Sequence, residues 1–253
     1  MVSTYNRESP EEDVDVILLA GGVGSRTGKS SPKQFLKLKG KEIARYSFDR
    51  LVAHPRVKTV VVVAHPEYRM VFCRDDEGRD AKLLFADPGS TRYQSVCNGI
   101  DRLTRYHSTY LTFEEAANRL VAIHDSARPF VSRASLDSVF KRASETGAAI
   151  LGSRCKSTLK KVEERGFISE TVDRHDLFEA QTPQVFRAGL LIDGIRQWSG
   201  TDDPTDDACL VEGLTKVWVL EGGAINCKIT TAEDLEMAEA IMEWYFKSLV
   251  HIV

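Results

Sequence analysis

The chain has 253 residues, of which 42% are hydrophobic and 28% charged, a composition typical of a globular protein with a sizeable core. Its formal net charge of −3 excludes a general attraction to nucleic acid or to an anionic membrane, so an anionic ligand must meet a local cluster of cations. No apolar run in the sequence reaches the roughly 18 residues that a transmembrane helix needs.

The amino-terminal segment and the cysteines bear on the compartment. Residues 1–13 (MVSTYNRESPEED) are polar and lack the apolar stretch of a signal peptide, so we expect a tail before a single domain over 14–247. The five cysteines are widely spaced and include no C-x-x-C pair, which predicts free thiols in a reducing compartment. We therefore expect a cytoplasmic protein, or one of a plastid-type organelle if a transit peptide has been removed.

Strand-like and helix-like segments alternate through residue 155. Aliphatic runs predict buried strands at 14–19, 57–64, 82–87, 120–123 and 148–153. The spacing of apolar residues predicts helices at 43–54, 91–103 and 132–146. This alternation predicts an α/β fold with a doubly wound, mostly parallel sheet, in which ligands bind at the carboxyl ends of the strands.

Two segments depart from this alternation, and a helix follows near the end. Residues 157–171 resemble two strands joined by a Glu-Arg-Gly turn, with too few apolar side chains to bury themselves. We expect a projecting β-arm that packs on a second copy of the chain in a homodimer. Residues 106–118 are interpreted as a surface insertion with a short helix around Glu114. A helix from Thr231 closes the chain, with Asp234 as the partner of Thr231 in a capping-box-like pair.

A glycine-rich stretch, LLAGGVGSRTGKSSPKQF over 18–35, follows the first predicted strand. Backbone N–H groups in such a turn can approach a ligand closely and attract anions. The glycine spacing fits neither the G-x-G-x-x-G dinucleotide pattern nor the G-x-x-x-x-G-K-[ST] phosphate loop. The loop carries Arg26 and Lys33, two cations that can neutralise a triphosphate and the transition state at its α-phosphorus. We expect Lys29 and Lys37 to face solvent.

Seven motifs in chain order resemble those of one nucleotidyltransferase family. They are LAGGVGSRTGKSSPKQF, PGSTRYQSVCNGI, IHDSARPFV, TVDR, QTPQVF, TDDACLVE and KITTAEDLEMAE. The chain is thereby similar to the 2-C-methyl-D-erythritol 4-phosphate cytidylyltransferases and their relatives, the ribitol 5-phosphate cytidylyltransferases. The resemblance implies a Rossmann-like nucleotidyltransferase that transfers CMP from CTP to 2-C-methyl-D-erythritol 4-phosphate, with release of pyrophosphate, in the non-mevalonate isoprenoid precursor pathway.

The same resemblance implies roles for single residues. Catalysis is implied for Arg26, Lys33, Arg174 and Lys228. Nucleotide binding is implied for Ala20, Gly21, Gly22, Gly89, Arg92, Ser95, Asp125 and Ser126. Binding of the polyol phosphate is implied for Thr158, Arg174, Arg128, Thr182, Thr205 and Asp206. Thr158 and Arg174 are expected to act in the active site of the partner subunit. A Mg²⁺ ion or another divalent cation, held mostly by the CTP phosphates, is expected near Asp125.

Two other interpretations stay open at this point. Ribitol 5-phosphate is the alternative acceptor, although HDSARPF and TVDR favour the erythritol enzyme. A non-catalytic nucleotide-binding module is the second alternative, and the joint presence of Arg26, Lys33, Arg174 and Lys228 argues against it. His124 could be taken for a general base, but an ionised phosphate needs none, and we interpret it as a packed histidine at a strand end.

Overall fold

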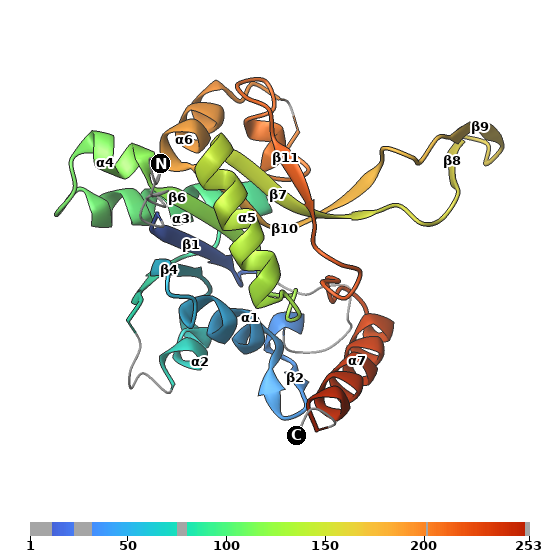
Figure 1. Ribbon diagram of the computed structural model, residues 1–253, viewed down its shortest axis with the longest axis horizontal. Helices are drawn as coiled ribbons and strands as arrows, with labels where there is room; N and C mark the ends of the chain where they lie inside the picture. Colours follow the sequence, from blue (N-terminus) through green and yellow to red (C-terminus); the bar gives the residue numbers. More distant parts are fainter. Residues whose placement is uncertain (1–11, 23–31, 75–79, 201, 251–253) are drawn as a thin grey trace, which may run out of the picture.

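A central sheet of seven strands organises the computed structural model, which describes residues 12–22, 32–74, 80–200 and 202–250 (Figure 1). Across the sheet the strands are β11 (Trp218–Glu221), β7 (Ala148–Arg154), β10 (Phe178–Arg187), β6 (Leu120–Asp125), β1 (Val14–Leu19), β4 (Val57–Val63) and β5 (Lys82–Ala86). Only β10 runs antiparallel to its neighbours. The predicted α/β fold with a mostly parallel sheet is confirmed.

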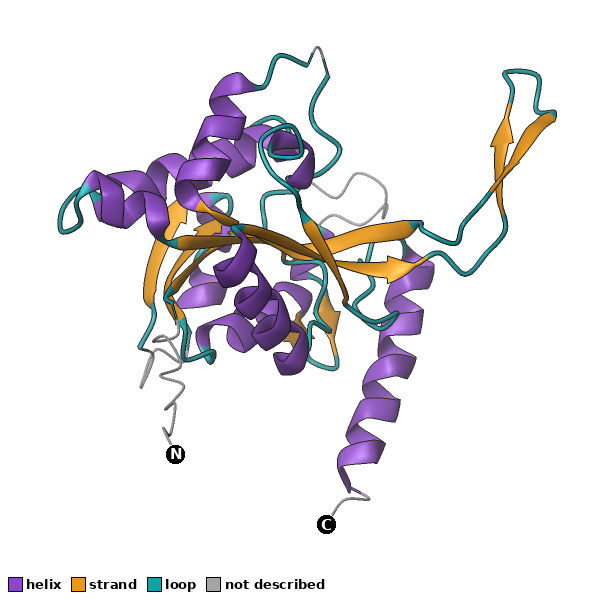
Figure 2. Cartoon of the chain, turned by 45° about the horizontal axis from the view of Figure 1, so that its top comes forward, coloured by secondary structure: helices purple, strands orange, loops and turns teal. Residues whose placement is uncertain are grey.

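Helices cover both faces of this sheet (Figure 2). One face packs on α1 (Ile43–Val52), α2 (Met70–Cys73) and α5 (Arg133–Thr146). The other packs on α3 (Arg92–His107) and α6 (Ala188–Gln197). In β1 the consecutive residues Val16 and Ile17 point to opposite faces, and both are fully buried. A strand covered on both sides has no solvent face, which is why its sequence reads as a continuous aliphatic run.

The helix ends show which local signals the fold uses. In α5, Ser132 accepts a hydrogen bond from the Ser135 amide, and Gly147 adopts the left-handed conformation with φ 84° that ends helices. The helix predicted over 132–146 therefore agrees with α5 and its N-cap. In contrast, α3 runs to His107, four residues beyond the predicted end at Leu103. In this last turn His107 is buried against the carboxylate of Asp15 at 3.1 Å, a contact that the spacing of apolar residues cannot predict.

The insertion and the C-terminal helix follow their caps. The short α4 (Phe113–Asn118) begins with a capping box between Thr112 and Glu115, which confirms the helix expected around Glu114. In α7 (Ala232–Val250) the Asp234 amide donates to Thr231 Oγ1 and the Thr231 amide donates to Asp234 Oδ2, as the capping-box pattern predicts. This helix packs on a small hairpin, β2 (Lys37–Leu38) with β3 (Lys41–Glu42). No helix in the described ranges has the length and apolar character to cross a bilayer.

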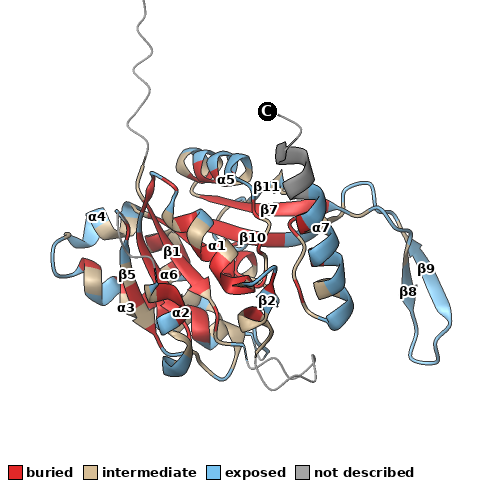
Figure 3. Cartoon of the chain, turned by 90° about the horizontal axis from the view of Figure 1, so that it is seen from below, coloured by how far each residue is buried: buried red, intermediate tan, exposed pale blue. Residues whose placement is uncertain are grey.

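The predicted arm is a two-stranded sheet of its own. Its strands are β8 (Leu159–Val162) and β9 (Ile168–Val172), antiparallel and joined by a turn with Gly166 at φ 83°. The arm extends away from the body (Figure 1), and its surface is exposed along its length (Figure 3). The side chains of Val162, Phe167 and Ile168 are 54%, 67% and 63% exposed. The hairpin is confirmed, whereas its role in a dimer and the domain limits at 14 and 247 stay predictions.

Candidate active site

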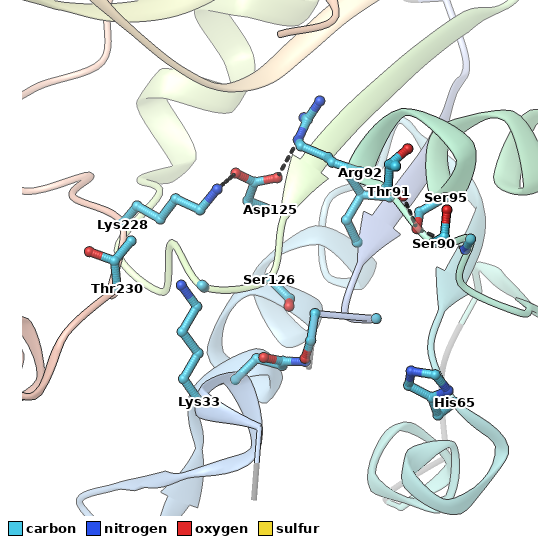
Figure 4. Close-up of a pocket in the computed structure, with 16 residues that line it drawn as sticks. Lys33, His65, Ser90, Thr91, Arg92, Ser95, Asp125, Ser126, Lys228 and Thr230 are labelled. Atoms are coloured by element: carbon cyan, nitrogen blue, oxygen red, sulfur yellow. Dashed lines mark hydrogen bonds and ion pairs between the residues drawn. The ribbon is translucent and has the colours of Figure 1, made fainter. Parts of the chain in front are cut away.

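A cavity of about 610 Å³ opens at the carboxyl ends of β1 and β6. This is the edge at which a parallel α/β sheet binds its ligands. Figure 4 shows side chains from both halves of the chain pointing into it. Nine residues predicted for the site line the cavity: Gly21, Gly22, Lys33, Gly89, Arg92, Ser95, Asp125, Ser126 and Lys228. Arg26 lies outside the described residues.

The backbone around Gly21 approaches the loop after β5 very closely. A Cβ atom at Gly21 would lie 2.3 Å from Cβ of Pro88, so only glycine fits. Gln34, the middle residue of η1 (Lys33–Phe35) in the PKQF segment, donates to the carbonyl of Ala20 at 2.8 Å and to that of Gly22 at 2.7 Å. The same short segment therefore presents Lys33 to the cavity and fixes the glycine turn. Ala20 itself is buried behind the cavity wall.

Asp125, the last residue of β6, lies between two cations. Its Oδ2 is 2.7 Å from Nζ of Lys228, and its Oδ1 accepts a hydrogen bond from Arg92 Nε at 3.2 Å. Burial opposes ionisation of this carboxyl, but Arg92 and Lys228 outweigh burial and hold its pKa well below its usual range. Asp125 is therefore a fixed anion at neutral pH. Arg92 has a second carboxylate partner, Asp207, which accepts hydrogen bonds from both of its terminal nitrogens and which the sequence analysis did not identify.

His124 and Thr182 form the support behind Asp125. The hydroxyl of Thr182 accepts a hydrogen bond from the Asp125 amide at 3.1 Å and lies 3.0 Å from Nδ1 of His124. His124 is completely buried, and burial lowers its pKa to about 4, so the ring is neutral at pH 7. Neither side chain lines this cavity or the second one described below. The interpretation of His124 as a packed residue is confirmed, whereas the predicted role of Thr182 in binding the acceptor stays a prediction.

A second cavity, of about 450 Å³, lies at the root of the arm. Basic and hydroxyl side chains line much of it, among them Arg128, Ser153, Arg154, Lys156 and Ser157. Arg128 is held by hydrogen bonds from its Nη1 to the carbonyl of Asn226 at 2.8 Å and from its Nη2 to that of Ala180 at 3.4 Å. Lys228 and Thr230 line both cavities, so the two spaces meet at these residues.

The other residues predicted for the acceptor do not line either cavity. Thr158 precedes β8, and Arg174 follows β9, where its Nη1 donates to the carbonyl of Lys156. Thr205 contacts Sγ of Cys209 at 3.3 Å. Asp206 accepts hydrogen bonds from the Cys209 amide and from Gln184, which is a bonding pattern that shapes a turn. The roles of these four residues stay predictions.

Other cavity residues carried weak signals or none. Gln34 is part of the PKQF motif, so the motif itself could have identified it as a site residue. His65 follows β4 and lines the first cavity (Figure 4), as expected for a residue at the carboxyl end of a parallel strand. Nothing in the sequence singled out Thr230 or Asp207. Within the described ranges, no group of three or more His, Cys, Asp or Glu side chains could hold a metal ion.

Lys33, Arg92 and Lys228 line this cavity at the carboxyl edge of the sheet, and such fixed cations suit a transfer at a nucleotide phosphate, which depends on positioning and charge neutralisation. The fold and the site thus define an α/β nucleotidyltransferase. A family model described as 2-C-methyl-D-erythritol 4-phosphate cytidylyltransferase (IspD) matches residues 14–244. The chain belongs to this family.

Relatives and solved structures agree with this assignment. A chloroplastic 2-C-methyl-D-erythritol 4-phosphate cytidylyltransferase of Oryza sativa is 40% identical over 234 residues, covering 92% of this chain and 75% of that protein. The enzyme of the same name from Rhodopirellula baltica is 37% identical over 236 residues, with 90% and 94% covered. The crystal structure of 4-diphosphocytidyl-2C-methyl-D-erythritol synthase from Anaerococcus prevotii matches with a TM-score of 0.76 at 23% identity, over 92% of this chain and 97% of that one, and shows the same fold.

Proposed function

We propose that this chain transfers CMP from CTP to 2-C-methyl-D-erythritol 4-phosphate in isoprenoid precursor synthesis. A phosphate oxygen of the acceptor bonds to the α-phosphorus of CTP, the bond from that phosphorus to the β-phosphate bridging oxygen breaks, and pyrophosphate leaves. Membership of the family supports this reaction. The observation that carries it is geometric, because a nucleotide-sized cavity and a smaller basic cavity meet at Lys228.

The residues act by holding charge and position. CTP occupies the first cavity, with its triphosphate near the glycine turn and Lys33. The acceptor occupies the second cavity, where Arg128 is available to its phosphate. Lys228, at the junction, neutralises charge on both the attacking and the reacting phosphate. Arg26 is assigned to transition-state stabilisation together with Lys33 on the basis of the motif. The nucleophile is already an anion, so no side chain has to remove a proton from it.

Magnesium enters this scheme with the nucleotide. The described residues offer a single carboxylate, Asp125, at the cavity, and each of its oxygens already faces a cation. This donor set suits Mg²⁺ held mainly by the CTP phosphates, since the ion is usually bound through one or two carboxylates plus substrate phosphates. The bound ion would neutralise charge on the leaving pyrophosphate.

The active assembly in this proposal is a homodimer. The exposed apolar side chains on the arm need a partner surface, and Thr158 and Arg174 at its root line neither described cavity of their own chain. In the dimer they complete the acceptor cavity of the second subunit. The five cysteines form no disulfide, which suits a reducing compartment, either the cytoplasm or a plastid like that of the rice relative.

The decisive experiment measures pyrophosphate release. The purified chain is supplied with CTP, Mg²⁺ and either 2-C-methyl-D-erythritol 4-phosphate or D-ribitol 5-phosphate, each at the same concentrations. We expect release with the erythritol substrate and a kcat/KM at least about 100-fold lower with the ribitol one. Preference for ribitol 5-phosphate would establish the alternative acceptor. A folded chain that binds CTP but releases no pyrophosphate with either acceptor would be a nucleotide-binding module.

A further inference from the structure

Asp207 ends a row of alternating charges that leads to the junction of the two cavities. Its carboxylate oxygens accept hydrogen bonds from Nη1 and Nη2 of Arg92 at 2.8 and 2.7 Å. Arg92 Nε donates to Asp125 Oδ1, and Lys228 Nζ contacts Asp125 Oδ2. The four side chains come from the loop before η3 (Ala208–Leu210), the start of α3, the end of β6 and the loop before α7. The row therefore joins four segments that are distant in the sequence.

The sheet holds Asp207 in place without help from a ligand. Asp207 is only 2% exposed and lines neither cavity. Gln184 of β10 accepts hydrogen bonds from the amides of Asp207 and Ala208, both at 2.9 Å, and so fixes the turn that carries the carboxylate. Burial raises the pKa of Asp207, and the ion pair with Arg92 opposes that rise. A buried carboxylate of this kind is costly unless it is fully paired, as this one is.

The bidentate pair decides what Arg92 can do in the cavity. Because Asp207 takes both terminal nitrogens, Arg92 meets Asp125 through Nε alone. Its planar fork is thus turned to a protein carboxylate, and its charge is balanced by two anions. Asp125, oriented through Oδ1, keeps Oδ2 for Lys228. Arg92 therefore transmits position to Asp125 more than it supplies free positive charge to a phosphate.

We propose that Asp207 is a positioning residue for CMP transfer: acting through Arg92 and Asp125, it holds Nζ of Lys228 at the junction of the nucleotide and acceptor cavities. This inference rests on the proposed function. Loss of the Asp207 charge should therefore affect CTP affinity and turnover in opposite directions. Removing the charge of Asp207 leaves Arg92 with one balancing anion, which favours a tetra-anionic nucleotide in the ground state, while Lys228 loses the position that it needs in the transition state.

The test compares Asp207→Asn with Asp203→Asn. Both variants remove one negative charge from the same loop, but Asp203 is exposed. For Asp207→Asn we expect kcat to fall about 10- to 100-fold, as for a displacement of about 1 Å at a reacting group, with a Kd for CTP equal to or below that of the wild type. For Asp203→Asn we expect kcat and Kd within about twofold of the wild type. Calorimetric titration of CTP gives Kd, and pyrophosphate release gives kcat.

The outcomes separate positioning from mere structural support. If Asp207→Asn keeps its kcat, or loses kcat and CTP affinity together with its melting temperature, the positioning role is overturned. Should Asp207→Asn fail to fold, Gln184→Met is the second variant, because it retains all four charges but loosens the turn that carries Asp207. If folded Gln184→Met keeps a kcat within about fivefold of the wild type, the role is also overturned. A wild-type chain that binds CTP but transfers no CMP overturns the proposed function and this role with it. An active wild type with an unaffected Asp207→Asn variant overturns the role alone.

Discussion

The close approach of Gly21 to Pro88 tests how the glycine turn after β1 is held against the loop after β5. In Gly21→Ala the new Cβ atom would lie 2.3 Å from Pro88 Cβ. Ordinary carbon contacts need about 3.5 Å, so the two loops must separate by about 1 Å. Pro88 is followed by Gly89, which lines the first cavity and whose amide donates to Ser95 Oγ at 3.0 Å. The strain therefore reaches the wall of the cavity that we propose for CTP.

The magnitude follows from these distances. Overpacking of this kind costs about 1–3 kcal/mol, which lowers the melting temperature of a chain of this size by about 2–12 °C. A shift of about 1 Å in a positioning wall lowers kcat/KM for CTP by up to about 100-fold. Differential scanning fluorimetry measures the first effect, and pyrophosphate release with varied CTP measures the second.

Two other glycines, one adjacent and one distant in the sequence, serve as controls. At Gly22 the nearest atom to an added Cβ is Gln34 Oε1 at 3.9 Å, so Gly22→Ala should melt like the wild type. At Gly213 nothing lies within 4 Å, so Gly213→Ala should match the wild type in both stability and activity. If Gly21→Ala binds CTP and turns over as the wild type does, the loops are not held by this contact and the reasoning fails.

Three further predictions test other parts of the molecule. Lys33→Ala should lower kcat by about 100- to 1000-fold and the affinity for CTP far less, because its charge acts mostly in the transition state; equal losses in titration and kinetics would contradict this. Burial lowers the pKa of His124 from 6.5 to about 4, so the unfolded chain binds a proton that the native chain excludes, and the free energy of unfolding should fall between about pH 6.5 and 4 by on the order of 3 kcal/mol. For His124→Gln, the free energy of unfolding from urea titrations should change less with pH in that window. An unchanged dependence on pH would show that the His124 ring does not cause the loss of stability. Phe167→Asp, at a side chain 67% exposed on the arm, should turn a dimer into a monomer by light scattering without lowering the melting temperature; a persistent dimer would place the interface elsewhere.

Much of the fold is readable from local signals in the chain. The strands β1 and β4 are aliphatic runs because both of their faces are covered. The ends of α5 follow from Ser132 and Gly147, whose side chain and backbone freedom act within one turn. The arm is a hairpin because its exposed residues cannot support a core. These features depend on neighbours a few residues apart, so spacing and residue type suffice to predict them.

Several residues of the candidate site can also be predicted from local motifs, whereas contacts between distant segments cannot. The glycine turn, Lys33 and Asp125 stand in motifs at the carboxyl ends of strands, and the alternation of strands and helices brings such ends to one edge of the sheet. The extra turn of α3 depends instead on burial of His107 against Asp15, which no pattern in α3 shows.

Residue type and spacing along the chain are enough to predict the class of fold, the arm and the family. The pairing of Arg92 with Asp207, 115 residues away, and the place of Lys228 where two cavities meet emerge only when the chain is folded. A cation and a carboxylate carry no local sign of which partner they will meet. Which charges balance one another is set by the packing that excludes water from between them.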